Sequence, residues 1–179
     1  PLSFPGNDIP GIMLASAVRD YATNFGVAVG DKVAIFTNND DAYRTAITLH
    51  EIGVTVPVII DARSRGGGEL AHHAKELGIR VENGKAILNV FGQKRVKAVT
   101  ICDYEKSGAN KEKIECDSIA MSGGWSPVVH LFSHCGGKLK WDEDLALFRP
   151  DKAAKPTSYD GLPFVTAVGS ANGFLLMNE

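Results

Sequence analysis

A buried strand, a helix and a second buried strand follow one another in the first half of the chain, and this order limits the fold more than any other feature. Val33–Phe36 and Val56–Ile60 are continuous apolar runs, which predicts strands that are covered on both faces. Between them, Asp40 or Asp41 can begin a helix with an apolar side. Two strands joined by a helix form a parallel pair with a right-handed crossover. The sequence therefore predicts an α/β fold with a short parallel sheet in residues 32–61.

The elements around this pair change in character along the chain. Asn83-Gly84, between two short strands, is a strong hairpin signal, so an antiparallel element is expected between Ile79 and Cys102. The other expected elements are helices at Ile12–Phe25 and Glu69–Leu77, strands at Ile79–Val81, Ala86–Val90, Val96–Cys102 and Ser118–Met121, helical turns at Val128–His134, a surface loop at Phe148–Asp160 and a buried strand at Phe164–Val168.

Composition excludes several classes of partner. The 179 residues carry a net charge of -2, which argues against nucleic-acid and membrane partners because both need a basic face. The cysteine number is odd and no CxxC pair occurs, which favours a cytoplasmic location and argues against thiol–disulfide chemistry. The chain begins at Pro1, and Gly173–Met177 suits a helix that has only begun. We therefore expect a segment of a longer protein.

The turn after the first buried strand lacks the residues of a dinucleotide site. Such a site needs three glycines there, for a tight turn, for approach of the pyrophosphate and for helix packing. This sequence has Thr37, Asn39 and Ala42 instead, and Asp40 and Asp41 place negative charge where a phosphate binds. The pattern predicts a Rossmann-like unit that has lost its nucleotide.

Charged residues after the second strand do not restore that site. Asp61 lies where a ribose-binding acid is expected, but alone it is insufficient. Arg63 and Arg65 are equally well interpreted as solvated charges. His130 and His134 are four residues apart, but no HExxH pattern supports a metal site, so no metal is expected.

Two glycine-containing turns remain as candidate cofactor contacts. Gly123 and Gly124 follow an apolar strand and permit close approach of either a cofactor or another loop. Gly169, Ser170 and Ala171 follow the last expected strand, where backbone N–H groups at a helix start attract phosphate. No arrangement of catalytic residues is visible from spacing, so no catalytic residue is predicted.

Several runs resemble the large (alpha) subunit of heterotetrameric sarcosine oxidase. The most specific is SGGWSPVVHL at Ser122–Leu131, within a longer match that begins at Cys116. Phe4–Met13, Phe36–Asp40 and Leu131–Asp142 support the same family. The resemblance covers essentially the whole chain.

This resemblance implies a flavoprotein of the disulfide reductase architecture, in which a second dinucleotide-type domain is inserted into the first. Residues 1–113 would be the inserted Rossmann-like domain with its entry segment, and residues 114–179 the returning, truncated part of the first domain. In the wider flavoprotein class an acid follows the glycine at the last turn, whereas here Ser170 follows Gly169. This difference favours NAD over a flavin in that domain.

The family oxidises sarcosine, or a similar N-methyl amine, to glycine, a one-carbon unit and hydrogen peroxide. The resemblance implies NAD in the intact subunit, FAD and FMN in the complex, and other oxidase subunits as partners. The segment itself is expected to be structural and cofactor-supporting, inactive alone and without a tightly bound cofactor. Two alternatives stay open: a subunit of another diflavin amine, opine or proline dehydrogenase, and a purely structural module at a subunit interface.

Overall fold

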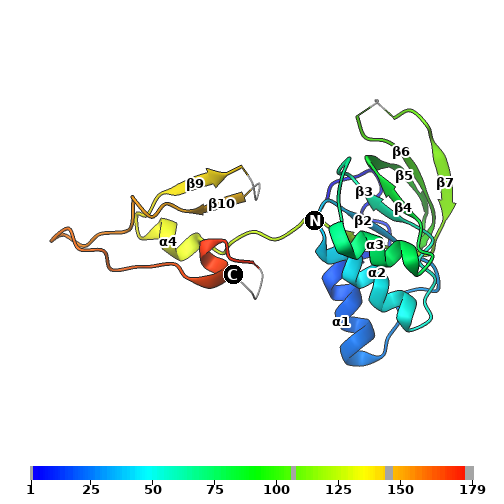
Figure 1. The fold of residues 1–179 in the computed structure, drawn as a ribbon, viewed down its shortest axis with the longest axis horizontal. Coiled ribbons are helices and arrows are strands. Elements are labelled where there is room, and N and C mark those ends of the chain that lie inside the picture. The colour runs from blue at the N-terminus through cyan, green and yellow to red at the C-terminus, as the bar shows by residue number, and fades with distance from the viewer. Residues whose placement is uncertain (1, 106–107, 144–146, 176–179) are drawn as a thin grey trace. The chain divides into compact units, whose positions relative to one another are not determined.

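The computed structural model describes residues 2–105, 108–143 and 147–175 and divides into two compact units (Figure 1): unit 1, Pro1–Gly124, and unit 2, Trp125–Glu179. Unit 1 contains β1 (Ile12–Leu14), α1 (Ala15–Phe25), β2 (Val33–Thr37), α2 (Asp41–Glu51), β3 (Ile59–Asp61), α3 (Gly68–Glu76), β4 (Val81–Asn83), β5 (Lys85–Gly92), β6 (Val96–Asp103), β7 (Glu112–Glu115) and β8 (Ser118–Ser122). Unit 2 contains α4 (His130–His134), β9 (Leu139–Asp142), β10 (Leu147–Pro150) and the 3-10 helix η1 (Gly169–Asn172).

A parallel sheet of five strands forms the centre of unit 1, in the order β1-β8-β2-β3-β4. Each neighbouring pair in this order is parallel. β2 and β3 pair directly, with Ile35 opposite Ile59 and Thr37 opposite Asp61. The predicted α/β fold and the short parallel sheet in residues 32–61 are therefore confirmed.

The sheet lies between helices on one face and an antiparallel sheet on the other (Figure 1). Successive side chains of a strand point to opposite faces. In β2, Val33 and Ile35 pack in the cluster that includes residues of α1, α2 and α3, whereas Ala34 and Phe36 pack in the cluster with β5 and β6. All five residues of β2 are buried, as a strand in a middle layer must be.

The antiparallel element predicted between Ile79 and Cys102 is present as β5 and β6, to which β7 adds a third strand. The expected hairpin at Asn83-Gly84 is wrong, because β4 pairs in parallel with β3. Gly84 has a left-handed φ of 67°, which suits a tight turn. This turn connects the parallel sheet to the antiparallel sheet, instead of joining two strands that pair with each other.

Two strands in unit 1 differ from the prediction in position or role. Ile12–Leu14, expected as the start of a helix, forms β1 and pairs with β8. The expected strand Ser118–Met121 is β8, and it lies between β1 and β2. Its pairing places it within unit 1, and the compact units divide after Gly124. The domain boundary expected at residues 113 and 114 stays a prediction.

Unit 2 has much less regular structure among its described residues. The expected helical turns form α4, and β9 and β10 make an antiparallel pair that includes the start of the expected surface loop Phe148–Asp160. The buried strand expected at Phe164–Val168 is wrong: the segment forms no strand, and Phe164 and Val168 are 57% and 73% exposed. The only sheet in the described part of unit 2 is the β9–β10 pair, and this segment does not join it.

The two-sided burial of β2 can be tested by truncating one side chain on each face. Ile35→Ala and Phe36→Ala are expected to lower the free energy of unfolding by about 2–5 and 3–5 kcal/mol, because each leaves a cavity in a different layer. Phe25→Ala is the control, since Phe25 is 71% exposed and its removal should change stability by less than about 0.5 kcal/mol. Urea unfolding measures all three. A loss at only one of the two β2 positions would contradict the three-layer arrangement.

Candidate functional site

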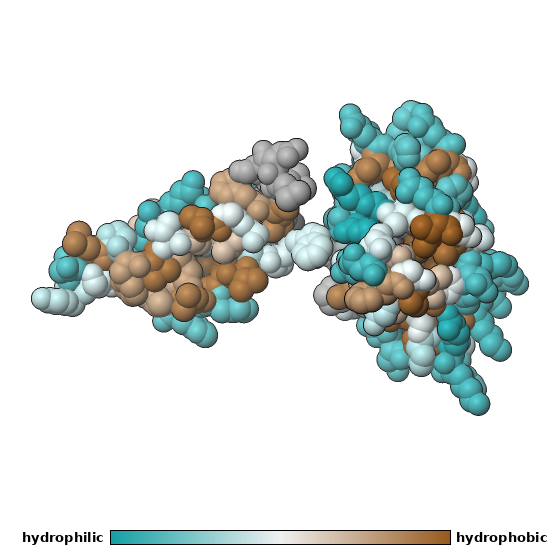
Figure 2. Space-filling view, turned by 90° about the horizontal axis from the view of Figure 1, so that it is seen from below, coloured by the Kyte–Doolittle hydropathy of each residue, from teal (hydrophilic) through white to brown (hydrophobic). Residues whose placement is uncertain are grey.

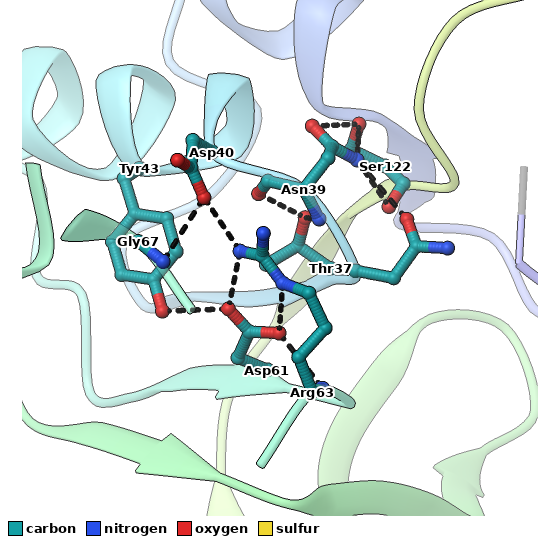
Figure 3. A network of polar contacts seen from close by, with 9 residues as sticks. Thr37, Asn39, Asp40, Tyr43, Asp61, Arg63, Gly67 and Ser122 are labelled. Carbon is teal, nitrogen blue, oxygen red and sulfur yellow. Dashed lines mark hydrogen bonds and ion pairs between the residues drawn. The ribbon is translucent and has the colours of Figure 1, made fainter. Parts of the chain in front are cut away.

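The candidate functional site of unit 1 is the edge where β2, β3 and β8 end (Figure 3). Ligands of open α/β sheets bind outside the carboxyl ends of the strands. Because these strands are parallel, their following residues meet at one edge: Asn38–Asp40 after β2, Ala62-Arg63 after β3 and Gly123-Gly124 after β8. The edge thus brings together three of the segments considered above.

The turn after β2 is stabilised by its own polar groups. The Thr37 hydroxyl donates to the Asn39 carbonyl at 2.9 Å and accepts from the Asn39 N–H at 3.0 Å. The Asn39 side-chain amide donates to the Ser122 carbonyl at 3.1 Å and to its hydroxyl at 2.9 Å. These contacts join the ends of β2 and β8 at the place where the glycines of a dinucleotide site would leave an open cradle.

Asp61, at the end of β3, has no exposed surface. Its carboxylate accepts from the Tyr43 hydroxyl at 2.8 Å and from three nitrogens of Arg63: the backbone N at 3.0 Å, Nε at 3.0 Å and Nη2 at 2.8 Å. Burying an unpaired carboxylate costs several kcal/mol, so these donors are what permits its burial. Asp61 occupies the position of a ribose-binding acid, but its bonds are already made within the chain.

The partners of Asp61 titrate outside their usual ranges. Burial, followed by the hydrogen bond to Asp61, raises the pKa of the Tyr43 hydroxyl. The hydrogen bonds to Asp61 and Asp40 raise the pKa of the Arg63 guanidinium, while burial opposes them. Throughout the physiological range Tyr43 therefore stays a neutral hydrogen-bond donor to Asp61, and Arg63 stays a cation.

Asp40 precedes α2 at the expected capping position, but its side chain does not cap that helix. Its Oδ1 accepts from Arg63 Nη2 at 2.7 Å and from the backbone N–H of Gly67 at 2.9 Å. Arg63 thus bridges Asp40 and Asp61 (Figure 3). The interpretation of Arg63 as a solvated charge is wrong.

Tyr43 and Gly67 belong to this network and were not singled out from the sequence. A Cβ on Gly67 would lie 2.6 Å from Cζ of Tyr43, and its φ is 85°, so both space and backbone conformation require glycine. Tyr43 lies on the apolar side of the helix that follows Asp40, which indicates that its side chain is buried. A buried tyrosine needs a hydrogen-bond partner for its hydroxyl. The partner itself was not visible from spacing.

The predicted cofactor glycines of unit 1 lie at this edge. Gly124 has a φ of 81°, and a Cβ there would lie 3.8 Å from Nδ2 of Asn39 and 4.0 Å from Oδ1 of Asn38. Gly124 is exposed and Gly123 is half-buried. The turn after β2 is thus a close neighbour of the Gly124 backbone.

The other predicted cofactor residues form η1 in unit 2. Gly169 has a φ of 56°, with nothing within 4 Å of a Cβ placed there, and Ser170 is exposed. The Gly169 carbonyl accepts from the Phe174 N–H at 3.2 Å, which closes the turn. Asn172 lines a cavity of about 100 Å³, well below the roughly 300 Å³ at which ligand pockets begin.

The two histidines that were considered as metal ligands belong to α4 in unit 2. His130 and His134 are the first and last residues of α4. Across the ranges that the structure describes, no group of three or more histidine, cysteine, aspartate or glutamate side chains is arranged to hold a metal ion. The described helices also include none with the length and apolar character needed to cross a membrane.

Three solved oxidoreductases illustrate the fold that this chain shares. A thioredoxin reductase of T. acidophilum matches 96% of this chain and 57% of its own, with a TM-score of 0.64 and 16% identity. A FAD-dependent pyridine nucleotide–disulphide oxidoreductase of Desulfovibrio vulgaris matches 80% and 37%, with a TM-score of 0.57 and 15% identity. L-proline dehydrogenase of P. horikoshii matches 96% and 27%, with a TM-score of 0.56 and 20% identity. At these identities the likeness is one of fold.

Sequence comparison gives a closer relationship. The sarcosine oxidase alpha subunit of Rhizobium meliloti (strain 1021) is 35% identical over 173 residues, which are 97% of this chain and 16% of that protein. The corresponding subunit of Corynebacterium sp. (strain U-96) is 38% identical over 157 residues, 86% of this chain and 16% of that protein. No protein-family model matches the chain. The chain is thus homologous to a segment of the sarcosine oxidase alpha subunit and spans about a sixth of its length.

The Arg63 bridge is expected to be necessary for the stability of unit 1. Arg63→Ala leaves the fully buried Asp61 carboxylate without its cation and should lower the free energy of unfolding by about 3 kcal/mol, the lower end for a broken buried pair, because Arg63 is partly exposed. Arg65→Ala is the matched control, since Arg65 is exposed and should change stability by less than about 0.5 kcal/mol. Urea unfolding distinguishes them, and equal losses would mean that Asp61 does not depend on Arg63.

Proposed function

We propose that this chain is a structural and cofactor-supporting segment of the large subunit of a sarcosine oxidase, and that it is inactive alone. The complete enzyme would demethylate sarcosine oxidatively to glycine, with a one-carbon unit and hydrogen peroxide as further products. Homology to sarcosine oxidase alpha subunits over 97% of the chain supports this assignment. The chemistry is assigned to the rest of the complex, with FAD and FMN, because the charged side chains of the site, Asp40, Asp61 and Arg63, are bound to one another.

The main support for this proposal is that the polar side chains at the carboxyl edge of unit 1 bind one another. A nucleotide in a Rossmann-like unit needs a free acid for its ribose and free N–H groups for its phosphates. Here Asp61 is buried and bound by Tyr43 and Arg63, and Asp40 places a carboxylate beside the first turn of α2. Unit 1 therefore serves as a scaffold, whose fold is that of a nucleotide domain.

Unit 2 is proposed to be the returning part of a first, NAD-binding domain, covered in the intact subunit by the remainder of that domain. Residues 114–179 are the predicted extent of this part, and the compact division after Gly124 supports a later start, at Trp125. Unit 2 exposes many large apolar side chains (Figure 2), and an isolated two-stranded sheet is marginally stable in water. These side chains are Trp125, Val128, Leu131, Trp141, Phe148, Tyr159, Leu162, Phe164, Val168 and Phe174.

An interface with other oxidase subunits is the alternative explanation for the same exposed apolar side chains. Large exposed apolar patches mark interaction sites in general, and this role needs no cofactor. The two roles differ in whether the η1 turn contributes to NAD binding. The cytoplasmic location inferred from cysteine usage stays a prediction.

The 179-residue chain alone is expected to bind neither NAD nor FAD with micromolar affinity. At the edge of unit 1, acidic side chains repel a phosphate and fill the place that a ribose would take. The NAD site proposed for unit 2 also needs the remainder of the first domain, which the 179-residue chain does not include. Calorimetric titration of the purified chain with each nucleotide measures this. Micromolar binding of either one would contradict the scaffold role of unit 1.

In the full-length subunit that carries this segment, Gly169→Val is expected to reduce bound NAD. The valine side chain would block the approach of NAD to the η1 backbone. Because Gly169 has a left-handed φ of 56°, valine at this position also lowers stability. Gly161→Val is the matched control: its φ is 79°, nothing lies within 4 Å of a Cβ there, and it belongs to the turn between Ser158 and Leu162.

Both variants should lose similar stability, and only Gly169→Val should lose NAD. The measurements are NAD released from the denatured complex and its melting temperature. If Gly169→Val retains as much NAD as Gly161→Val, the η1 turn is structural and the alternative interface role is favoured.

A further inference from the structure

Asp40 departs from the local rule for its position. An aspartate before a helix ordinarily accepts from the backbone N–H groups of the first turn, which stabilises the helix by about 1 kcal/mol. The Asp40 side chain makes no such bond with α2. Its Oδ1 is directed instead to Arg63 Nη2 at 2.7 Å and to Gly67 N–H at 2.9 Å. A charged contact between elements has replaced a helix cap.

The two donors that Asp40 binds are those of an oxyanion site. A guanidinium and a backbone N–H at a helix start are ordinary ligands for phosphate oxygens. Gly67 is required for the approach of this backbone, because a side chain there would collide with Tyr43. The Asp40 side chain is 52% exposed, so the donors would be open to solvent without it.

Asp40 adds a second carboxylate to Arg63, whose single positive charge Asp61 alone would balance. Arg63 shares Nη2 between the two carboxylates, and Asp61 on its inner side is completely buried. The neighbouring acid Asp41 does not compete, because its carboxylate pairs with Arg19 at 3.2 Å. Asp40 is therefore the anion on the outer side of Arg63.

We propose that Asp40 is an internal counter-anion that occupies the place of a ligand phosphate and thereby excludes anionic ligands from unit 1. The proposal rests on the scaffold role given to unit 1. It assigns the exclusion of anionic ligands to a single residue, Asp40. It implies that the donors of an oxyanion site, Arg63 and Gly67 N–H, are intact beneath the Asp40 carboxylate. Removing that carboxylate should create a site for inorganic phosphate.

The test compares wild type, Asp40→Ser and Asp41→Ser in the 179-residue chain. Serine keeps an N-cap residue before α2 and withdraws the carboxylate from Arg63 and Gly67. Asp41→Ser removes the same charge from the next residue without opening the site. Melting temperatures are measured in sodium phosphate and in sodium chloride of equal ionic strength and pH, and phosphate affinity is measured by calorimetry.

Asp40→Ser should be stabilised specifically by phosphate and should bind it about tenfold or more tightly than wild type does, because its donors no longer have an internal competitor. Wild type and Asp41→Ser should show no specific effect. Adding Arg63→Gln to Asp40→Ser should abolish the response. Asp40→Gly, also a tolerated N-cap residue, is a second variant with the same expected response.

A phosphate response absent from both folded Asp40 variants, or equal in wild type, overturns the proposal. Failure of both variants to fold also overturns the proposal. A residue whose role is to exclude a ligand should not be needed for folding. These outcomes are independent of the scaffold role, which is tested by NAD and FAD titration of wild type. Wild type that binds a nucleotide refutes the scaffold role, whereas Asp40 variants without a phosphate response refute only the counter-anion.

Discussion

The carboxyl edge of unit 1 depends on a single constraint: the Asp61 carboxylate is completely buried. A buried charge is tolerated only when it is paired and hydrogen-bonded. Tyr43 from α2 and Arg63 from the segment after β3 provide the donors. Arg63 in turn reaches Asp40 before α2, and Asp40 reaches the backbone at the start of α3. One buried group therefore determines how two helices begin relative to the end of β3.

The opposite end of the sheet is organised by a different acid. The Asp117 carboxylate accepts from the backbone N–H groups of Asp31 at 2.9 Å and Lys32 at 3.2 Å, which aligns β8 with the start of β2. Arg95 donates to the Asp117 carbonyl at 3.1 Å and so joins the antiparallel sheet to the same point. Both ends of the central strands are thus fixed by polar contacts, and the two apolar clusters fill the layers between them.

The sequence predicted those parts of the fold that depend on neighbouring residues. The apolar runs of β2 and β3 and the helix between them are local patterns, and their parallel pairing follows from the crossover rule. The Asn83-Gly84 turn was misassigned because its local geometry is compatible with a hairpin, whereas the competing partner of β4 is β3, more than 20 residues earlier in the chain. For Phe164–Val168, apolar character alone predicted a strand, but in the described residues of unit 2 the segment does not join the β9–β10 sheet.

The candidate site shows the same limit in chemical terms. Asp61 at the end of β3 is the residue that a nucleotide site would have, and the sequence correctly places it there. Whether such an acid binds a ribose depends on where its hydrogen-bond donors come from, and Tyr43 lies 18 residues away from it. Gly66 and Gly67 likewise permit close approach to the backbone, but what approaches them is the chain's own Asp61, Arg63 and Tyr43. Because an internal ligand and an external one require the same acid and the same glycines, the sequence pattern of a nucleotide site cannot by itself distinguish a site that binds a ligand from one that its own side chains have filled.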